Sequence, residues 1–119
     1  MKIYRIAQLL APLIRGYKAV GVTPEGQGYS LYGGKSCYID LTIGGWMKDC
    51  PTSKGFYLGS SKEYVLTYYS GLTDDDELLL TYEFSKDDLL EGDPDSICSM
   101  GSELRVSQAQ LIDKEEIAK

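Results

Sequence analysis

The side chains that could do chemistry in this chain of 119 residues are carboxylates, hydroxyls and three thiols, because the sequence contains no histidine. Without imidazole, serine–histidine and cysteine–histidine catalysis, histidine metal ligands and the usual general base near neutral pH are excluded. Cys37, Cys50 and Cys98 are too few and too scattered for a four-cysteine zinc site. We therefore expect no metal and no cofactor. This set of reactive side chains favours a protein that is not an enzyme, although it does not exclude catalysis.

The sequence does not match the patterns of calcium-binding or phosphate-binding loops. The acidic runs at 74–77 and 87–95 lack the alternating oxygen spacing of a calcium-binding loop. The glycine groups at 26–28 and 33–34 precede predicted strands rather than a helix, so they do not match a phosphate-binding loop. All four segments predict turns.

The charge is acidic and unevenly distributed. The formal net charge is −6, and nucleic-acid binding needs clustered Lys and Arg, so nucleic acid is not expected as the main partner. Residues 1–62 carry eight Lys/Arg and three Asp/Glu, whereas residues 63–119 carry four and fifteen. The favoured interpretation is that the two halves pack together and neutralise each other. The alternative is a basic face and an acidic face that steer a partner.

The compartment is predicted from the cysteines and the hydropathy. Three cysteines are an odd number, unlike the even count of a secreted disulfide framework. No segment approaches the roughly 20 apolar residues of a membrane span, and the start of the chain is a poor signal peptide. We therefore expect a cytoplasmic protein that does not bind a membrane.

Turn residues and apolar alternation predict a domain rich in β-strands. The fold class is α+β, with one domain over 1–119 that contains a small curved, mostly antiparallel β-sheet and one or two short helices. Residues 113–119 are expected to form a frayed, charged tail. Strands are expected at 17–22, 29–32, 37–41, 55–58, 78–84 and 103–111.

One helix has clear boundaries in the sequence. Ser60 and Glu63 form a capping box, in which each side chain satisfies a free backbone N–H at a helix start. Gly71 stands where a left-handed C-terminal cap is expected. The sequence therefore predicts a short helix at about 61–70 that carries two tyrosines on one face.

Aromatic and basic residues in the first half of the chain suggest a binding surface. Aromatic rings that stack on a base beside Lys would suit a small nucleotide, and the same combination would suit a protein partner. The aromatic residues could instead belong to the core. The residues expected to bind a ligand or partner are Lys18, Lys35, Trp46, Lys54, Phe56 and Tyr57.

Residues 55–84 contain, in succession, an aromatic strand, a Gly-Ser-Ser turn, a helix with tyrosines and a further strand. This order resembles the middle of ADP-ribosyltransferase-like folds, in which such a turn and a helix tyrosine cradle a nicotinamide. The resemblance implies an NAD-binding enzyme as the alternative function. It would assign nucleotide binding to Arg5, the nicotinamide cradle to Ser60 and Tyr64, and the catalytic carboxylate to Glu103.

A second resemblance covers more of the chain and rests on four short motifs, which are Tyr17-Lys18, Gly28-Tyr29-Ser30-Leu31, Gly45-Trp46-Met47 and Lys54-Gly55-Phe56. Their order is similar to that in a group of short uncharacterised bacteriophage and prophage proteins. The resemblance implies a phage-encoded protein of the host cytoplasm that binds a host target, including components of antiviral defence.

The favoured function is therefore a small non-enzymatic binding or inhibitory protein that acts on a host protein or sequesters a nucleotide-type signal. The identity of the partner and the oligomeric state do not follow from the sequence.

Overall fold

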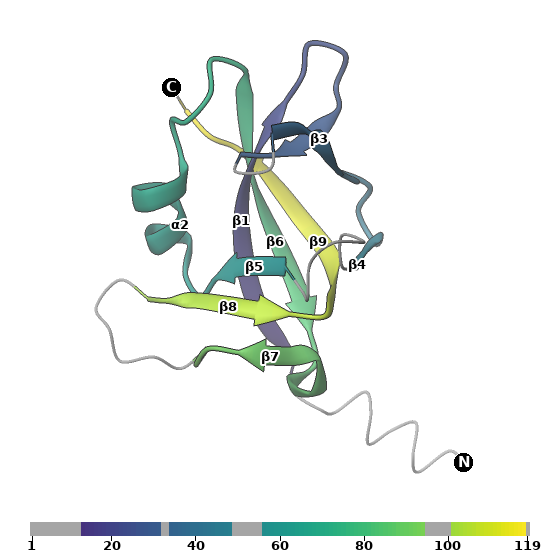
Figure 1. The fold of residues 1–119 in the computed structure, drawn as a ribbon, viewed down its shortest axis with the longest axis vertical. Helices are drawn as coiled ribbons and strands as arrows, with labels where there is room; N and C mark the ends of the chain where they lie inside the picture. The colour runs from purple at the N-terminus through teal and green to yellow at the C-terminus, as the bar shows by residue number, and fades with distance from the viewer. Residues whose placement is uncertain (1–12, 32–33, 49–55, 95–100, 119) are drawn as a thin grey trace.

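The computed structural model describes residues 13–31, 34–48, 56–94 and 101–118, with the backbone alone for residues 34–37 and 48 (Figure 1). Nine strands, one α-helix and one 3-10 turn lie in these ranges. In chain order they are β1 (Ile14–Val22), β2 (Gly28–Ser30), β3 (Gly34–Ile39), β4 (Trp46–Lys48), β5 (Phe56–Gly59), α2 (Lys62–Tyr69), β6 (Asp76–Phe84), η1 (Lys86–Asp88), β7 (Leu89–Glu91), β8 (Glu103–Val106) and β9 (Gln108–Glu116).

The long strand β1 organises the sheet. One of its edges pairs with β6 from Ile14↔Phe84 to Val22↔Asp76. Its other edge pairs with β2 near the end of the strand and with β5 through Tyr17. The sheet therefore branches at β1 into two paths, β3–β2–β1–β6–β9–β4 and β1–β5–β8–β7. All of these pairings are antiparallel.

The first path must bend, because its two terminal strands are joined by a short connection. Five strand spacings of about 4.8 Å would separate β3 from β4 by roughly 24 Å in a flat sheet. Residues 40–45 could cover that distance only if fully extended, at roughly 3.4 Å per residue step. They contain a turn instead, since the Gly45 N–H donates to the Thr42 carbonyl at 2.9 Å. The sheet therefore folds back on itself, although β3, β4 and β7 each keep an edge without a strand partner in the described part.

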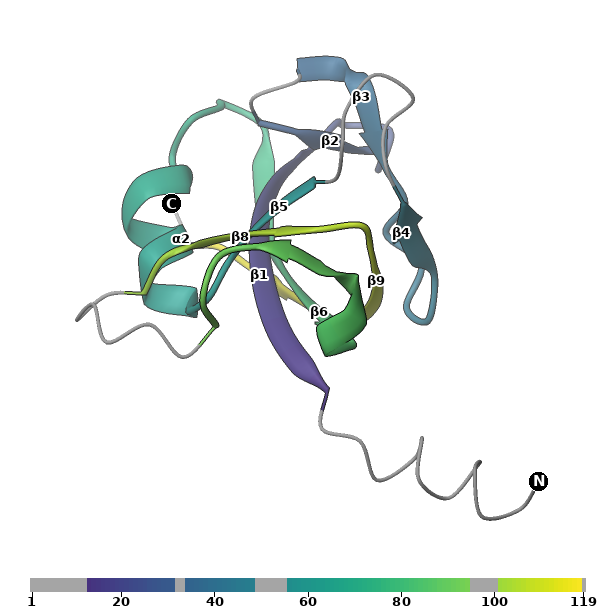
Figure 2. The same ribbon diagram turned by 60° about the horizontal axis from the view of Figure 1, so that its bottom comes forward.

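The main core lies between the long strands β1, β6 and β9 and the crossing strands β5, β8 and β7 (Figures 1 and 2). Alternate residues of each strand point into it, as expected for strands with one buried face. Its buried members are Val20, Ile39, Phe56, Leu58, Leu80, Tyr82, Phe84, Leu104, Val106, Ala109 and Leu111.

The helix α2 covers part of the opposite face of the sheet. Ala19 of β1 and Leu79 of β6 point away from the main core and pack against Val65 of α2. This small second cluster is why Leu79 is buried.

The predicted class, an α+β domain dominated by antiparallel strands, is confirmed. The helix predicted at about 61–70 is α2, and Gly71 after it has a positive φ of 75°. The predicted cap is wrong by one residue. The Ser61 hydroxyl, not that of Ser60, accepts the N–H of Tyr64, at 3.1 Å.

Two charged segments are more ordered than the sequence suggested. Glu77 is buried, and its carboxylate accepts the N–H groups of Gly71 and Leu72 at 2.7 and 3.1 Å. It therefore fixes the end of α2 to the start of β6. Strand β9 continues to Glu116, so residues 113–116 belong to the sheet and not to a frayed tail.

Candidate functional site

The helix α2 meets the sheet at Gly59, the last residue of β5. Gly59 pairs with Tyr17 of β1 on one side and with Glu103 of β8 on the other. A Cβ atom at Gly59 would collide with Cγ2 of Val65 and would lie 3.0 Å from Cδ1 of Tyr64. The absence of a side chain thus lets α2 contact the backbone of β5 directly. We call the place where β5, α2 and β8 meet the Gly59 junction.

Tyrosines gather around this junction. The ring centroid of Tyr64 lies 5.2 Å from that of Tyr68 and 5.7 Å from that of Tyr69. Tyr17 of β1 is directly opposite Gly59, so its side chain lies on the same face of the sheet as α2. The Lys62 ammonium lies 6.0 Å from the centroid of its ring. Tyr57 lies two residues before Gly59 and therefore on the same face of β5. We call these residues the tyrosine surface, which comprises Tyr17, Tyr57, Tyr64, Tyr68 and Tyr69.

The helix leaves much of its apolar surface in solvent. An amphipathic helix normally buries a stripe of apolar residues, whereas Val65 is the one buried residue of α2. Tyr68 is 57% exposed and Leu66 is 40% exposed, and Leu72, just after the helix, is 52% exposed. Large apolar side chains at this density on one short segment are typical of a contact surface.

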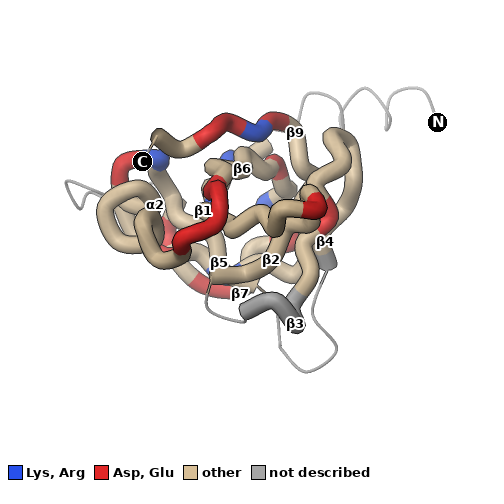
Figure 3. Tube along the Cα trace, turned by 90° about the horizontal axis from the view of Figure 1, so that it is seen from above, with Lys and Arg blue, Asp and Glu red and all other residues tan. Residues whose placement is uncertain are grey.

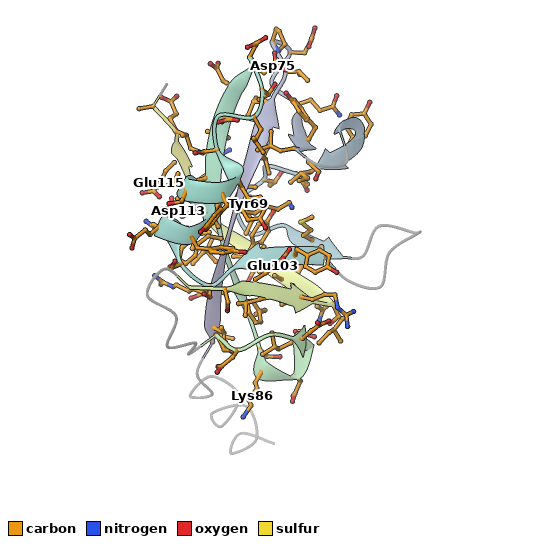
Figure 4. All side chains as sticks on the ribbon, turned by 60° about the vertical axis from the view of Figure 1, so that its left-hand side comes forward. Tyr69, Asp75, Lys86, Glu103, Asp113 and Glu115 are labelled. Atoms are coloured by element: carbon orange, nitrogen blue, oxygen red, sulfur yellow. The ribbon has the colours of Figure 1, made fainter. Side chains whose placement is uncertain are left out.

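Carboxylates surround the tyrosines (Figure 4). Glu103 is exposed, and its side chain leaves the sheet on the face where α2 lies, because it is directly opposite Gly59. Glu63 is exposed on the helix itself. The cation Lys62 pairs with Glu115 at 3.0 Å, and hydrogen bonding to that carboxylate raises the pKa of the Lys62 ammonium.

The hydroxyls of the Gly-Ser-Ser turn have structural partners. The Ser60 hydroxyl accepts the N–H of Ser102 at 2.7 Å, and the Ser60 N–H donates to the Ser102 carbonyl at 2.7 Å. The Ser61 hydroxyl caps α2. The turn therefore holds the ends of β5 and β8 together at the start of the helix.

The predicted binding residues do not form one patch in the described part of the chain. Phe56 is 7% exposed and belongs to the core. Lys18 is half-buried and lies on the core side of β1, opposite Leu80. Trp46 and Tyr57 are exposed, but on the outer faces of two different paths of the sheet, with the core between them. The side chains of Lys35 and Lys54 lie outside the described residues.

The residues of the alternative, ADP-ribosyltransferase-like hypothesis are closer together. Ser60, Tyr64 and Glu103 all lie at the Gly59 junction. Arg5 lies outside the described residues. Sequence reasoning missed Gly59 as the centre of the site and Tyr17 as a member. Nothing in the local pattern could have shown them, because both depend on the pairing of β1, β5 and β8.

One polar group inside the core has no partner among the described residues. Tyr82 is fully buried, and its hydroxyl makes no hydrogen bond within the described part of the chain. Burial, with a smaller contribution from the charge of Asp40, raises the pKa of this hydroxyl far above that of an exposed tyrosine. A buried hydroxyl without a hydrogen bond destabilises a fold, typically by about 1–3 kcal/mol.

The described residues contain no group of three Asp, Glu or Cys side chains that could hold a metal ion. Cys50 and Cys98 lie outside these residues, and Cys37 is described by its backbone alone. Among the described segments, no helix has the length and apolar character needed to cross a membrane.

No protein-family model, curated protein or solved structure matches this chain.

Proposed function

We propose that this chain is a non-enzymatic binding protein that attaches to a partner protein through the tyrosine surface at the Gly59 junction. The observation that carries the proposal is the exposure of Tyr68, Leu66 and Leu72 on and beside a helix with one buried residue. Tyrosine is enriched among the residues that dominate binding energy, because a stiff ring buries a large area at a small entropic cost.

The order of the surrounding structure supports this role. The tyrosine rings pack against one another, and the hydroxyls of Tyr64 and Tyr69 lie 3.5 Å apart. Glu77 and Ser61 fix the two ends of α2. A surface that is already ordered loses little side-chain entropy when a partner binds.

The test is capture of binding proteins on immobilised full-length chain, followed by mass spectrometry, with two matched variants. Tyr68→Ser should remove the captured partner, because it deletes the most exposed ring of the surface. Trp46→Ser should retain it, since β4 lies on the other side of β1 from α2 (Figures 1 and 2). Both variants must keep the melting temperature of the parent. The proposal fails if Trp46→Ser abolishes capture and Tyr68→Ser does not.

The wider proposal concerns the partner. The partner would be a host protein, and the chain would inhibit it in the host cytoplasm if the chain is encoded by a phage. The support for this extension is the resemblance of four short motifs described above. A nucleotide-type signal is the other proposed ligand. The carboxylates of Glu63 and Glu103 beside the tyrosines disfavour phosphate there, so a nucleotide would bind elsewhere on the chain.

A second candidate function is an ADP-ribosyltransferase-like enzyme, favoured by the proximity of Ser60, Tyr64 and Glu103. In this case NAD at millimolar concentration should raise the melting temperature of the parent chain. Glu103→Gln should abolish NAD hydrolysis while the chain stays folded. No thermal shift with NAD would eliminate this candidate and leave the binding protein.

A further inference from the structure

We propose that the tyrosine surface receives a positively charged protein segment, in which Arg or Lys side chains stack on the tyrosine rings beside Glu63 and Glu103. This inference rests on the proposed function and adds the chemistry of the partner. The faces of aromatic rings carry negative potential and attract cations, most often the guanidinium of Arg. A nearby carboxylate adds a hydrogen-bonding partner for the same group.

The charge of the surrounding surface supports a cationic partner. The chain carries eighteen Asp and Glu against twelve Lys and Arg, a formal net charge of −6. Figure 3 shows acidic positions near α2 and along β9. Such an excess steers cationic segments toward the molecule and repels nucleic acid and other polyanions.

The charges close to the Gly59 junction also favour a cationic partner. Of the two cations there, Lys62 pairs with Glu115 at 3.0 Å and Arg105 pairs with Glu91 at 3.2 Å. The Glu63 and Glu103 carboxylates make no ion pair with any described residue. The two cations described at the junction are therefore already engaged, whereas the carboxylates of Glu63 and Glu103 can accept hydrogen bonds from outside the chain.

The pairing of β5 with β8 fixes the position of Glu103. It stands directly opposite Gly59, where a Cβ atom would meet Val65 first and would lie 3.0 Å from Cδ1 of Tyr64. The Ser60 and Ser102 backbones hold this end of the two strands together. Glu103 and Tyr64 therefore both adjoin Gly59 on this face of the sheet, where a carboxylate and an aromatic ring could together recognise a guanidinium.

The experiment is a titration of the full chain, labelled with nitrogen-15, followed by NMR. The probes are a synthetic peptide that alternates Arg with Gly and Ser, and the same peptide with Gln in place of Arg. The Arg peptide should shift amide signals of α2 and of residues 57–60 and 103–105, and added salt should weaken this binding. The Gln peptide should produce no such shifts.

Two matched variants locate the site. Glu103→Gln should weaken binding of the Arg peptide by roughly two- to five-fold, the effect of removing one exposed charge at a contact. Glu25→Gln makes the same chemical change at the exposed tip of the β1–β2 hairpin and should leave the affinity unchanged. Tyr68→Ser should weaken binding further than Glu103→Gln.

The outcomes separate this inference from the proposed function. Shifts spread over all acidic segments, equal losses in Glu103→Gln and Glu25→Gln, or no binding of the Arg peptide would each overturn the cationic partner. The proposed function would still stand if Tyr68→Ser, and not Trp46→Ser, abolished capture of a partner protein. It would fall, together with this inference, if Tyr68→Ser retained that partner.

Discussion

The chain uses tyrosine in two different environments. Tyr29 and Tyr82 are buried in the sheet, whereas Tyr57 and Tyr68 lie exposed around the Gly59 junction. The same residue type therefore builds the interior in one region and presents a contact surface in the other. The difference is set by the neighbours of each residue, since Tyr57 and Tyr82 are both on strands but Tyr82 points into the core and Tyr57 points away from it.

The buried tyrosines also differ from each other. The Tyr29 hydroxyl donates to the Asp75 carboxylate at 2.7 Å and lies 2.8 Å from the Thr73 hydroxyl. The Tyr82 hydroxyl has no hydrogen-bond partner in the described ranges. Tyr29 thus stabilises the fold through both its ring and its hydroxyl, whereas Tyr82 does so through its ring alone.

The largest difference between the two regions should appear when a whole ring is deleted. Tyr82→Ala removes a side chain from the centre of the core and should lower the free energy of unfolding by about 3–5 kcal/mol. Tyr68→Ala removes an exposed ring and should change it by no more than about 0.5 kcal/mol. Urea unfolding followed by circular dichroism measures both. Equal losses would contradict the assignment of Tyr68 to a contact surface.

The next largest effect concerns the packing of α2 on the sheet. Gly59→Ala places a methyl group where Val65 lies and should cost about 1–3 kcal/mol of stability. The loss should be smaller when Val65→Ala is introduced first, because that change removes the colliding methyl groups. The four unfolding free energies form a double-mutant cycle. A coupling energy near zero would show that α2 is not seated on Gly59.

The fold could be predicted in outline because local rules act on neighbouring residues. Alternation predicted a strand at 78–84, where β6 begins two residues earlier. Turn residues separated the strands predicted at 17–22 and 29–32, and Gly71 predicted the end of α2. The helix cap was missed by one residue because Glu63, three residues after Ser60, makes Ser60 the better cap in sequence. Ser60 was instead recruited by Ser102, 42 residues away.

The site was less predictable, since it depends on which strands become neighbours. Phe56 and Tyr57 are adjacent in sequence and were predicted to bind together, but alternation places one in the core and the other outside. Residues 113–116, the last part of β9, were predicted to belong to a frayed tail because they are charged. Four charged residues are compatible with a strand here because one edge of residues 113–116 has no strand partner among the described residues, and charges protect such an edge.

A hydroxyl with partners should matter more than one without. Tyr29→Phe removes the bonds to Asp75 and Thr73 and should lower stability by about 1.5 kcal/mol, a typical value for a hydrogen bond to a charged group. Tyr38→Phe is the matched control, because Tyr38 is directly opposite Tyr29 in β3 and is exposed. It should leave the unfolding midpoint in urea unchanged. A loss as large in the control would mean that the hydroxyl of Tyr29 is not specifically stabilised.

The smallest effect has the opposite sign. Tyr82→Phe removes the unpartnered hydroxyl and keeps the ring that packs against Phe56 with centroids 6.1 Å apart, so stability at neutral pH should rise by about 1 kcal/mol. A loss of stability would mean that the hydroxyl is bonded in solution, for example to a buried water molecule.

The pH dependence of the stability of Tyr82→Phe tests the burial of the Tyr82 hydroxyl. Burial raises the pKa of Tyr82 in the folded chain, whereas in the unfolded chain it titrates near pH 10. Above about pH 10 the unfolded state therefore releases a proton that the folded state keeps, and this group makes the parent lose about 1.4 kcal/mol per pH unit. The stability difference between Tyr82→Phe and the parent should widen accordingly between neutral pH and pH 11. A constant difference for Tyr82→Phe would show that this hydroxyl reaches solvent, and the contrast between the two regions would be lost.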